Sequence, residues 1–216
     1  MLTICKRHSY SLFLIVLGKY NPYNSAAMIR LLSGTTLDEK HDLLSLNFAQ
    51  ISYRVWLDKP VKNNIYFMAK NKFESAFAVD KGIRLRKLIC CSGNARKVWE
   101  IPKGRKKSKY EQDLQCAVRE FYEETHIPRS SYKLYMNATR TYSYIDDNTR
   151  YTNKYFIAYT THNIEPWIDF KSYEQLSEIG DIKWMTIEEM RIVDPSGRLP
   201  NIAKHIFNYV RKQSKK

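Results

Sequence analysis

The sequence predicts an α+β fold around a mixed sheet, interrupted by a helical insertion, and three observations lead to that class. Residues 3–17 alternate weakly and then become apolar, which is typical of a strand entering a core. Residues 25–96 carry apolar side chains at helical spacing with few turn residues. Residues 134–161 are rich in Tyr, Thr and Ile and are broken by Asp146-Asp147-Asn148, which predicts a β-hairpin.

The first element includes the longest apolar run, LFLIVL, from Leu12 to Leu17. A bilayer span needs about 20 apolar residues, so this run is too short to be one. Lys6 and Arg7 before it resemble the start of a signal peptide, but the run is below the usual length for that role. We therefore predict a buried strand here.

In the helical insertion, Thr36 and Glu39 form a T-x-x-E capping box that predicts the start of one helix. Lys59-Pro60 predicts the end of this helix, because a proline disfavours helical geometry at the residue before it. Beyond the hairpin, IKWMTIEEM predicts a strand and then a helix that starts at a second box, Thr186 to Glu189. In LPNIAKHIFNYVRK the apolar residues share one face of a terminal helix, with Pro200 near its first turn.

The chain is strongly basic. Its 216 residues contain 36 Lys and Arg against 22 Asp and Glu, a net charge of +14. This excess predicts a polyanionic partner, which can be nucleic acid, polyphosphate or a membrane surface, and charge alone does not choose among them.

The cysteines bear on the compartment of the protein. There are four, Cys5, Cys90, Cys91 and Cys116, with no C-x-x-C spacing, and an adjacent pair is poor disulfide geometry. We predict reduced, mostly buried thiols in a cytoplasmic protein.

A short helix concentrates acidic residues in this basic chain. Ser108 and Glu111 form an S-x-x-E box, which predicts a helix start near Ser108. At 100° per residue the core face is formed by Leu114, Ala117, Val118 and Phe121, and a separate solvent-facing arc by Glu120, Glu123 and Glu124. Such like charges repel, and a divalent cation among them would relieve the repulsion. Oxygen-only ligands favour Mg²⁺ or Mn²⁺, which serve phosphate substrates. The alternative is a solvated acidic face.

The spacing around this helix resembles the Nudix box, G-x5-E-x7-R-E-U-x-E-E-x-G-U, where U is an aliphatic or aromatic residue. The matching residues are Gly104, Glu111, Arg119, Glu120, Phe121, Glu123, Glu124 and Ile127. Two positions depart from it: six residues separate Gly104 from Glu111, and His126 replaces the second glycine. The resemblance implies a Nudix α/β/α sandwich and a metal-dependent pyrophosphohydrolase.

The same resemblance implies roles for individual residues. Glu120, Glu123 and Glu124 would bind the metal, while Glu111 would pair with Arg119 and brace the helix. The segment EIGDIKW is similar to the E-I-x-x-I-x-W segment of mRNA-decapping Nudix enzymes, so Glu178 is a candidate metal ligand or general base. Asp181 is the alternative candidate for this role. The third possibility is that the segment is a solvated turn without a catalytic role.

The substrate class follows from the residues around the box. WEIPKG, CAVRE and EET resemble the decapping branch, and nearly the whole chain resembles the mRNA-decapping Nudix proteins of large nucleocytoplasmic DNA viruses. KRHSYS starts only five residues after Met1, whereas those relatives carry further strand sequence. Either the start is late or the sheet lacks an edge strand. By this resemblance we expect N-terminal Nudix strands in residues 1–24, an RNA-binding helical insertion in 25–96 and the catalytic domain in 97–216.

Capped mRNA is the expected partner, with no membrane and no obligatory protein partner, in the cytoplasm of an infected host cell if the protein is viral. We expect an RNA backbone to be bound by the cations beside the box: Lys103, Arg105, Lys106, Lys107 and Lys109. The aromatic candidates for stacking on methylguanine are Tyr20, Tyr23, Trp56 and Tyr144. The alternatives are a Nudix hydrolase of diphosphoinositol or dinucleoside polyphosphates, and a catalytically silent RNA-binding module.

Overall fold

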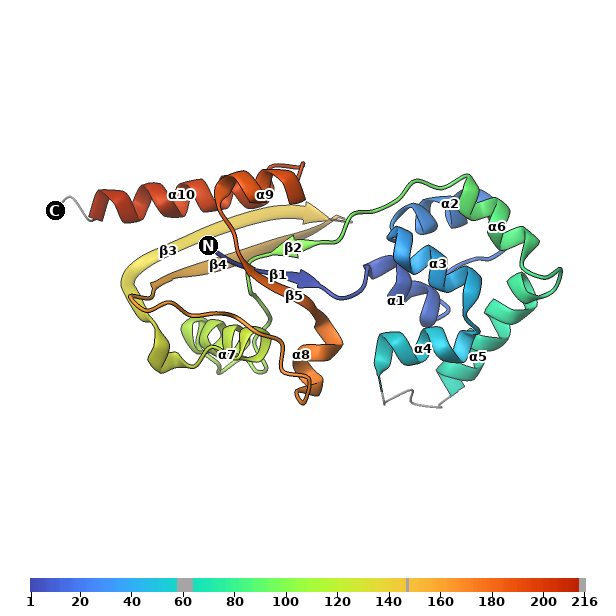
Figure 1. The fold of residues 1–216 in the computed structure, drawn as a ribbon, viewed down its shortest axis with the longest axis horizontal. Helices are drawn as coiled ribbons and strands as arrows, with labels where there is room; N and C mark the ends of the chain where they lie inside the picture. Colours follow the sequence, from blue (N-terminus) through green and yellow to red (C-terminus); the bar gives the residue numbers. More distant parts are fainter. Residues whose placement is uncertain (58–63, 147, 214–216) are drawn as a thin grey trace. The chain divides into compact units, whose positions relative to one another are not determined.

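The chain divides into two compact units, which are described separately. The computed structural model describes residues 1–57, 64–146 and 148–213. The sheet unit consists of Met1–Cys5 and Trp99–Lys216, and the helical unit is Lys6–Val98. Figure 1 shows the elements of both units along the chain.

The helical unit is built from short helices around one apolar core. Phe48, Ile51, Leu32 and Met28 are among its most buried side chains, and α2 packs against α6 while α1 packs against α4 and α5. Its elements are α1 (Tyr10–Val16), α2 (Ser25–Ser33), α3 (Leu37–Ser45), α4 (Phe48–Trp56), α5 (Asn64–Phe73), the π-helical turn η1 (Glu74–Ala78) and α6 (Ile83–Cys90).

The prediction of a buried strand over Leu12–Leu17 is wrong, because most of this run is helix α1. The side chain of Ser9 caps α1 by accepting the N–H of Leu12 at 3.1 Å. Leu12, Ile15 and Val16 are buried at helical spacing. A short apolar run suits a buried strand and a buried helix equally, and the core around it decides. The strand at the N-terminus is only β1 (Leu2–Lys6), and the helical unit begins at Lys6 instead of residue 25.

The capping box of Thr36 and Glu39 is confirmed: the Thr36 N–H donates to Glu39 Oε2 at 2.8 Å and the Glu39 N–H donates to Thr36 Oγ1 at 3.3 Å. The single long helix expected after it is wrong. Leu46 is extended, and Asn47 starts a new helix with a reciprocal box to Gln50, both bonds being 3.0 Å. Asparagine favours caps over helix interiors, which explains the break. The expected end at Lys59-Pro60 lies outside the described residues.

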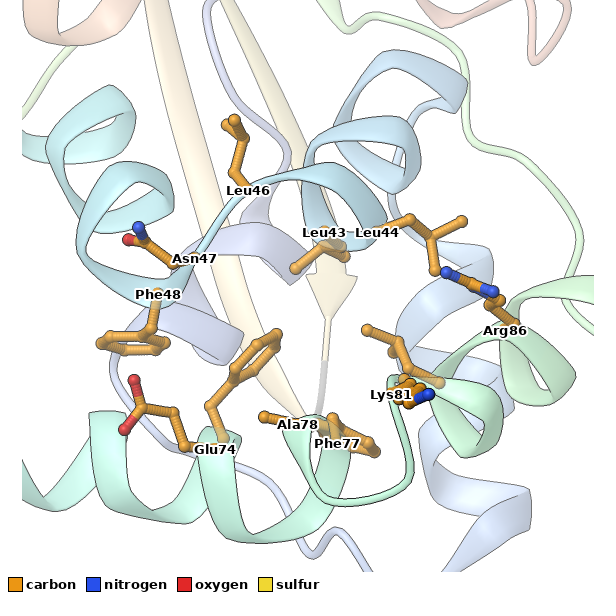
Figure 2. A pocket seen from close by; sticks show the side chains of 13 residues that line it. Leu43, Leu44, Leu46, Asn47, Phe48, Glu74, Phe77, Ala78, Lys81 and Arg86 are labelled. Carbon is orange, nitrogen blue, oxygen red and sulfur yellow. The ribbon is translucent and has the colours of Figure 1, made fainter.

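The helical unit contains a pocket of about 210 Å³, which Figure 2 shows from close by. Leu43, Phe48 and Phe77 contribute apolar lining from α3, α4 and η1, and Lys81 and Arg86 contribute cationic side chains at and before α6.

The sheet unit contains two sheets. The first has the order β2-β1-β5, with β2 at Trp99–Glu100 and β5 at Ile179–Trp184. β1 is antiparallel to β2, with Ile4 opposite Glu100. The backbone of Met1 bonds that of Met185 in both directions, at 2.7 and 2.9 Å. The second sheet is the hairpin of β3 (Lys133–Asp146) and β4 (Thr149–Tyr159), which confirms the predicted hairpin.

Helices lie on both sides of these strands. Figure 1 shows α7 on one side and the α9–α10 pair on the other, an arrangement that confirms the α+β class. The remaining elements are α7 (Asp113–Thr125), the 3₁₀ turn η2 (Arg129–Ser131), α8 (Tyr173–Glu178), α9 (Ile187–Val193) and α10 (Arg198–Gln213). The box of Thr186 and Glu189 starts α9 as predicted, and Pro200 lies in the first turn of α10 as predicted.

None of the four cysteines, which all lie in the described part of the chain, forms a disulfide. Cys5 and Cys116 are buried, but Cys90 and Cys91 at the end of α6 are exposed, so the expectation of mostly buried thiols is wrong for that pair. Within the part of the chain that the structure describes, no helix has the length and apolar character to cross a membrane.

Candidate active site

Helix α7 begins five residues later than the sequence predicts. It starts at Asp113, after Gln112 as N-cap, so the expected box of Ser108 and Glu111 is wrong. Ser108 Oγ accepts the N–H of Tyr110 at 3.3 Å, and Glu111 accepts the N–H of Lys107 at 2.7 Å. The carboxylate of Glu111 is thus engaged by the loop and by Arg119, and the segment before α7 stays irregular.

Arg119 is the centre of the acidic cluster. Its Nε donates to Glu111 Oε1 at 2.8 Å and its Nη2 donates to Glu111 Oε2 at 3.1 Å. Its Nη1 donates to Glu120 at 2.8 Å and to Glu123 at 2.9 Å. The hydrogen bonds from Arg119, followed by the one from the Lys107 backbone, lower the pKa of Glu111 to about 2. The Arg119–Glu111 pair that the family resemblance implied is therefore present, and the same guanidinium reaches two of the three candidate metal ligands.

Glu123 also bonds the loop before the helix. Its Oε1 accepts from Lys107 Nζ at 2.8 Å. Partial burial acts to raise the pKa of Glu123, but the hydrogen bonds and charges of Lys107 and Arg119 outweigh it and lower the pKa below its ordinary value. Glu123 therefore stays ionised near neutral pH.

Glu124 differs from its neighbours, because it is only 4% exposed. The expectation that it faces solvent is wrong. Its Oε2 accepts the backbone N–H of Lys103 at 2.8 Å, so the carboxylate is buried against the loop that precedes the box. A buried carboxylate needs such donors to remain charged.

Gly104 lies against the carboxylate of Glu120. A Cβ at this position would meet Glu120 Cδ and Oε2 at 1.9 Å and Oε1 at 2.2 Å. Since real Cβ contacts lie beyond about 3 Å, only glycine lets the loop approach Glu120 this closely. This contact gives a physical reason for a glycine before the helix.

His126 stands where the family pattern has a second glycine, and it adopts that left-handed conformation with φ of 54°. A non-glycine residue tolerates this at modest cost. Here the imidazole stacks on Tyr122 with ring centroids 5.6 Å apart, and its Nδ1 lies 3.6 Å from Asp169 Oδ2. These contacts offset the cost of the substitution.

Gln175 is a positioning residue that the sequence analysis missed. It is 1% exposed and lies on α8. Its Nε2 donates to the carbonyl of Glu124 at 3.0 Å and to that of Trp167 at 3.4 Å, and its Oε1 accepts the N–H of Asp169 at 2.7 Å. A single glutamine in the segment YEQLSE gives no pattern from which these contacts could be predicted.

Glu178 is exposed at the end of α8, and Asp181 is exposed on β5, where its Oδ1 accepts its neighbour Ile182's N–H at 2.8 Å. Among the residues that the structure describes, no three His, Cys, Asp or Glu side chains are gathered as a metal site. The reason is visible in the contacts: Glu120 and Glu123 turn to Arg119, and Glu124 turns to the Lys103 backbone. The donor set is nevertheless all carboxylate oxygen, which fits a hard divalent cation.

The basic loop beside the box is partly neutralised by acids of the chain itself. Lys103 pairs with Glu100 at 2.8 Å, Lys106 pairs with Asp113 at 2.6 Å, and Lys107 pairs with Glu123. Lys109 lies over the ring of Tyr110 at 5.0 Å. Among the described residues, the side chains of Arg105 and Lys109 have no carboxylate partner within 4.0 Å, so these two are the cations of the loop that are open to a phosphate.

A cavity of about 700 Å³ adjoins this loop. The apolar face of α7, with Leu114, Ala117, Val118 and Phe121, forms part of its wall. Phe121 also packs against the apolar core of the sheet unit, as expected for the core face, whereas the other three are half-buried at the cavity. β4 and α10 also contribute to the lining, and so do Lys103 and Gly104. Ligand sites typically have about 300–1,000 Å³.

The aromatic candidates separate into two groups. Tyr20 and Trp56 pack against the core of the helical unit, and Tyr23 is exposed there with the Arg84 guanidinium over its ring at 5.5 Å. Tyr144 is on the hairpin of the sheet unit, stacked against Tyr151.

Comparison with known proteins identifies the class of this enzyme. The model of the NUDIX domain matches residues 86–208, more than half of the chain. The chain belongs to the Nudix family, whose members generally use divalent metal ions, and the expected Nudix fold is confirmed.

Two curated relatives extend this match to most of the chain. The mRNA-decapping protein g5R of African swine fever virus, isolate Pig/Kenya/KEN-50/1950, is 32% identical over 195 residues, which cover 87% of this chain and 78% of that protein. The g5R protein of the strain Badajoz 1971 is also 32% identical over 195 residues, covering 87% of this chain and 77% of the relative. Among solved structures, a C. elegans Ap4A hydrolase binary complex covers 55% of this chain and 78% of its own, at 18% identity and a TM-score of 0.43.

Proposed function

We propose that this protein is an mRNA-decapping Nudix hydrolase, which cleaves the cap pyrophosphate to release (methyl)guanosine diphosphate and RNA with a 5′-monophosphate. The observation that carries the proposal is the match to the viral g5R decapping proteins, which extends over 87% of the chain and includes both units. The carboxylates on α7 and the adjoining cavity support a diphosphate substrate that carries a nucleoside.

We assign the binding of Mg²⁺ or Mn²⁺ to Glu120, Glu123 and Glu124, with Glu178 as a candidate further ligand. A divalent ion held there supplies charge neutralisation of the pyrophosphate and activation of water. Glu120 and Glu123 are available as ligands once they turn from Arg119, which keeps its bidentate contact with Glu111.

In the reaction, the oxygen of water forms a bond to a phosphorus of the cap, and the bridging P–O bond breaks. We propose that the carboxylate of Glu178 accepts a proton from that water. Asp181 is the alternative proton acceptor. Because Gly104 has no side chain, the loop can lie against the carboxylate of Glu120. Gln175 donates a hydrogen bond to the carbonyl of Glu124 and so holds the main chain there. These residues hold the carboxylates in position, which is where much of the rate enhancement in phosphoryl transfer arises.

Binding of the RNA body is assigned to the basic loop and to the helical unit. In the loop, Arg105 and Lys109 are the cations without a carboxylate partner among the described residues, whereas Lys103, Lys106 and Lys107 are paired. In the helical unit, cations gather around α6: Lys81, Arg84, Arg86 and Lys87. We propose the host cytoplasm as the place of action, because capped mRNA is translated there.

The decisive assay is cap-labelled RNA with and without Mg²⁺ or Mn²⁺. We expect metal-dependent release of labelled guanosine diphosphate, at a kcat/KM that rises with RNA length. If the protein instead releases phosphate from a diphosphoinositol, or cleaves dinucleoside polyphosphates with no preference for RNA, the decapping proposal fails within the Nudix family. If it binds RNA and shows no metal-dependent turnover on any of these substrates, it is a silent binding module.

The loop assignment has its own measurement. Replacing Arg105 and Lys109 by Gln removes about two counterion-release terms, so the slope of log K against log salt for single-stranded RNA becomes shallower by roughly 0.7 × 2, about 1.4. Replacing the paired Lys103 and Lys106 by Gln is the matched control and changes the slope less. Equal effects of the two double variants would contradict the assignment.

A further inference from the structure

The hairpin of the sheet unit carries an aromatic surface to which the reaction proposed above assigns no residue. Tyr142 and Tyr144 are two residues apart on β3, so they share one face of the strand. Tyr144 lies directly opposite Tyr151 of β4, and the two rings are stacked with centroids 5.3 Å apart and an angle of 17°. Tyr142 is 37% exposed.

The first residue of α10, Arg198, lies on this surface. Its Cζ is 4.3 Å from the ring centroid of Tyr144 and 5.3 Å from that of Tyr142. We call Tyr142, Tyr144, Tyr151 and Arg198 the tyrosine–arginine track. A planar guanidinium over aromatic rings is a favourable pairing, and it leaves the N–H groups at the edge of the guanidinium free to donate.

Arg198 is half-buried, and among the side chains that the structure describes, which do not include those of residues 146 and 147, no carboxylate lies within 4.0 Å of it. The carboxylate nearest to it in sequence, Asp194, is engaged by other groups. Asp194 Oδ1 accepts from the N–H of Ser196 at 3.1 Å, and its Oδ2 accepts from the N–H of Leu199 at 2.6 Å. None of the described acidic side chains therefore competes with a ligand phosphate for the guanidinium of Arg198.

The track continues in two directions. Along β3, Arg140 lies on the same strand face and its Cζ is 5.1 Å from the ring of Tyr209 on α10, a second arginine–tyrosine pair. At the other end, Tyr151 lines the same cavity as Lys103 and Gly104. The track is therefore continuous with the cavity beside the candidate carboxylates.

We propose that the tyrosine–arginine track binds single-stranded RNA, with bases stacking on the tyrosine rings and a phosphate bound by Arg198. Stacked aromatic side chains combined with unpaired guanidinium groups are the features by which proteins hold unpaired nucleotides, because every base has a flat face and every nucleotide a charge. This inference rests on the proposed function and adds to it a binding site for the RNA body within the catalytic unit.

The test compares Arg198→Gln with Arg191→Gln. Arg191 is the matched control, because it is an exposed arginine on the preceding helix α9 and is paired with Glu188 at 3.6 Å. The probe is an uncapped single-stranded RNA, whose affinity is measured by fluorescence anisotropy over a range of salt. We expect Arg198→Gln to weaken binding about tenfold and to make the log K against log salt slope shallower by roughly 0.7. Arg191→Gln should leave both unchanged.

A second variant separates stacking from charge. Tyr142→Leu should weaken the binding of single-stranded RNA but not of an RNA duplex of equal length, whose bases are not available to stack. Arg198→Lys keeps the charge and loses the planar fork, so it should restore the salt slope with only part of the affinity.

Hydrolysis of a cap dinucleotide keeps this test independent of the proposed function. We expect Arg198→Gln and Tyr142→Leu to change its kcat/KM less than twofold. If RNA affinity is unchanged in both variants while capped RNA is still hydrolysed, the track is not an RNA site and the proposed function stands. If Arg198→Gln lowers dinucleotide hydrolysis as much as RNA affinity, Arg198 lies at the diphosphate. If it lowers the affinity for heparin as much as the affinity for RNA, the track is a general polyanion surface. Either result overturns the inference.

Discussion

Gly104→Ala offers a direct test of how the loop and α7 cooperate, because the added methyl group meets one functional side chain. The new Cβ would lie 1.9 Å from the Glu120 carboxylate, and ordinary contact begins at 3.4 Å. The carboxylate must therefore move by 3.4 − 1.9 = 1.5 Å. No positive φ is involved at Gly104, so the alanine backbone is not strained.

The consequence falls on activity more than on stability. The atoms that must move are the end of a flexible side chain, so the fold can absorb the methyl group at small cost. A displacement of this size at a reacting centre costs about 10²-fold in rate, and we expect kcat to fall by that order while Tm changes by less than about 2 °C, the shift that corresponds to a fraction of a kcal/mol.

The assay is kcat and KM on capped RNA at saturating Mg²⁺ or Mn²⁺, together with thermal unfolding. Gly93→Ala is the control, because its Cβ would lie 3.9 Å from Ser33, in ordinary contact. If the loss acts through Glu120, combining Gly104→Ala with Glu120→Gln should cost little more than Glu120→Gln alone. Additive losses, or a kcat within threefold of wild type, would refute the reasoning.

The remaining predictions concern four other carboxylates. Glu124→Gln should keep Tm, because the amide oxygen can still accept the backbone N–H of the loop, but lower kcat by more than about tenfold, near 1.4 kcal/mol; a smaller loss contradicts its role as a ligand. If Glu178 is the general base, Glu178→Gln should slow turnover by about 10²–10⁴-fold and retain RNA affinity. If only Asp181→Asn causes that loss, Asp181 is the general base instead. The hydrogen bond from Lys183, followed by that from the Thr186 backbone, lowers the pKa of Glu189 to about 2, below its ordinary 4.5. This contribution to stability is present above pH 4.5 and is lost as pH falls toward 2, so the Tm difference between wild type and Glu189→Gln should disappear over that range.

The sequence predicted the structure correctly where residues close together in the chain determine it. The β3–β4 hairpin, with Asp146 opposite Thr149, and the boxes at Thr36 and Thr186 follow from turn and cap chemistry within a few residues, and all were predicted correctly. The same chemistry failed at Ser108, because a distant side chain, Arg119, draws Glu111 away from the helix start. A cap is a weak interaction of about 1 kcal/mol, and a bidentate arginine contact outweighs it.

The periodicity of apolar residues could not distinguish a buried strand from a buried helix. Leu12–Leu17 is apolar throughout, so it carries no period that separates strand from helix. The burial of Glu124 was missed for a related reason. The helical wheel orders side chains around an axis but does not say which outside segment packs on each arc, and the loop at Lys103 covers the arc that holds Glu124.

The carboxylates on α7 show what the sequence argument for a metal ion left out. Glutamates at these spacings repel one another, and the sequence analysis expected a divalent cation among them, with a solvated acidic face as the alternative. In the structure Arg119, on the same helix, already supplies a positive charge, with Nη1 between Glu120 and Glu123 at 2.8 and 2.9 Å. Glu120 and Glu123 would have to give up this contact to hold the metal ion proposed above. Because Glu111 holds the other side of the guanidinium, we expect Arg119 to stay in place when they turn, and the helix to persist in both states.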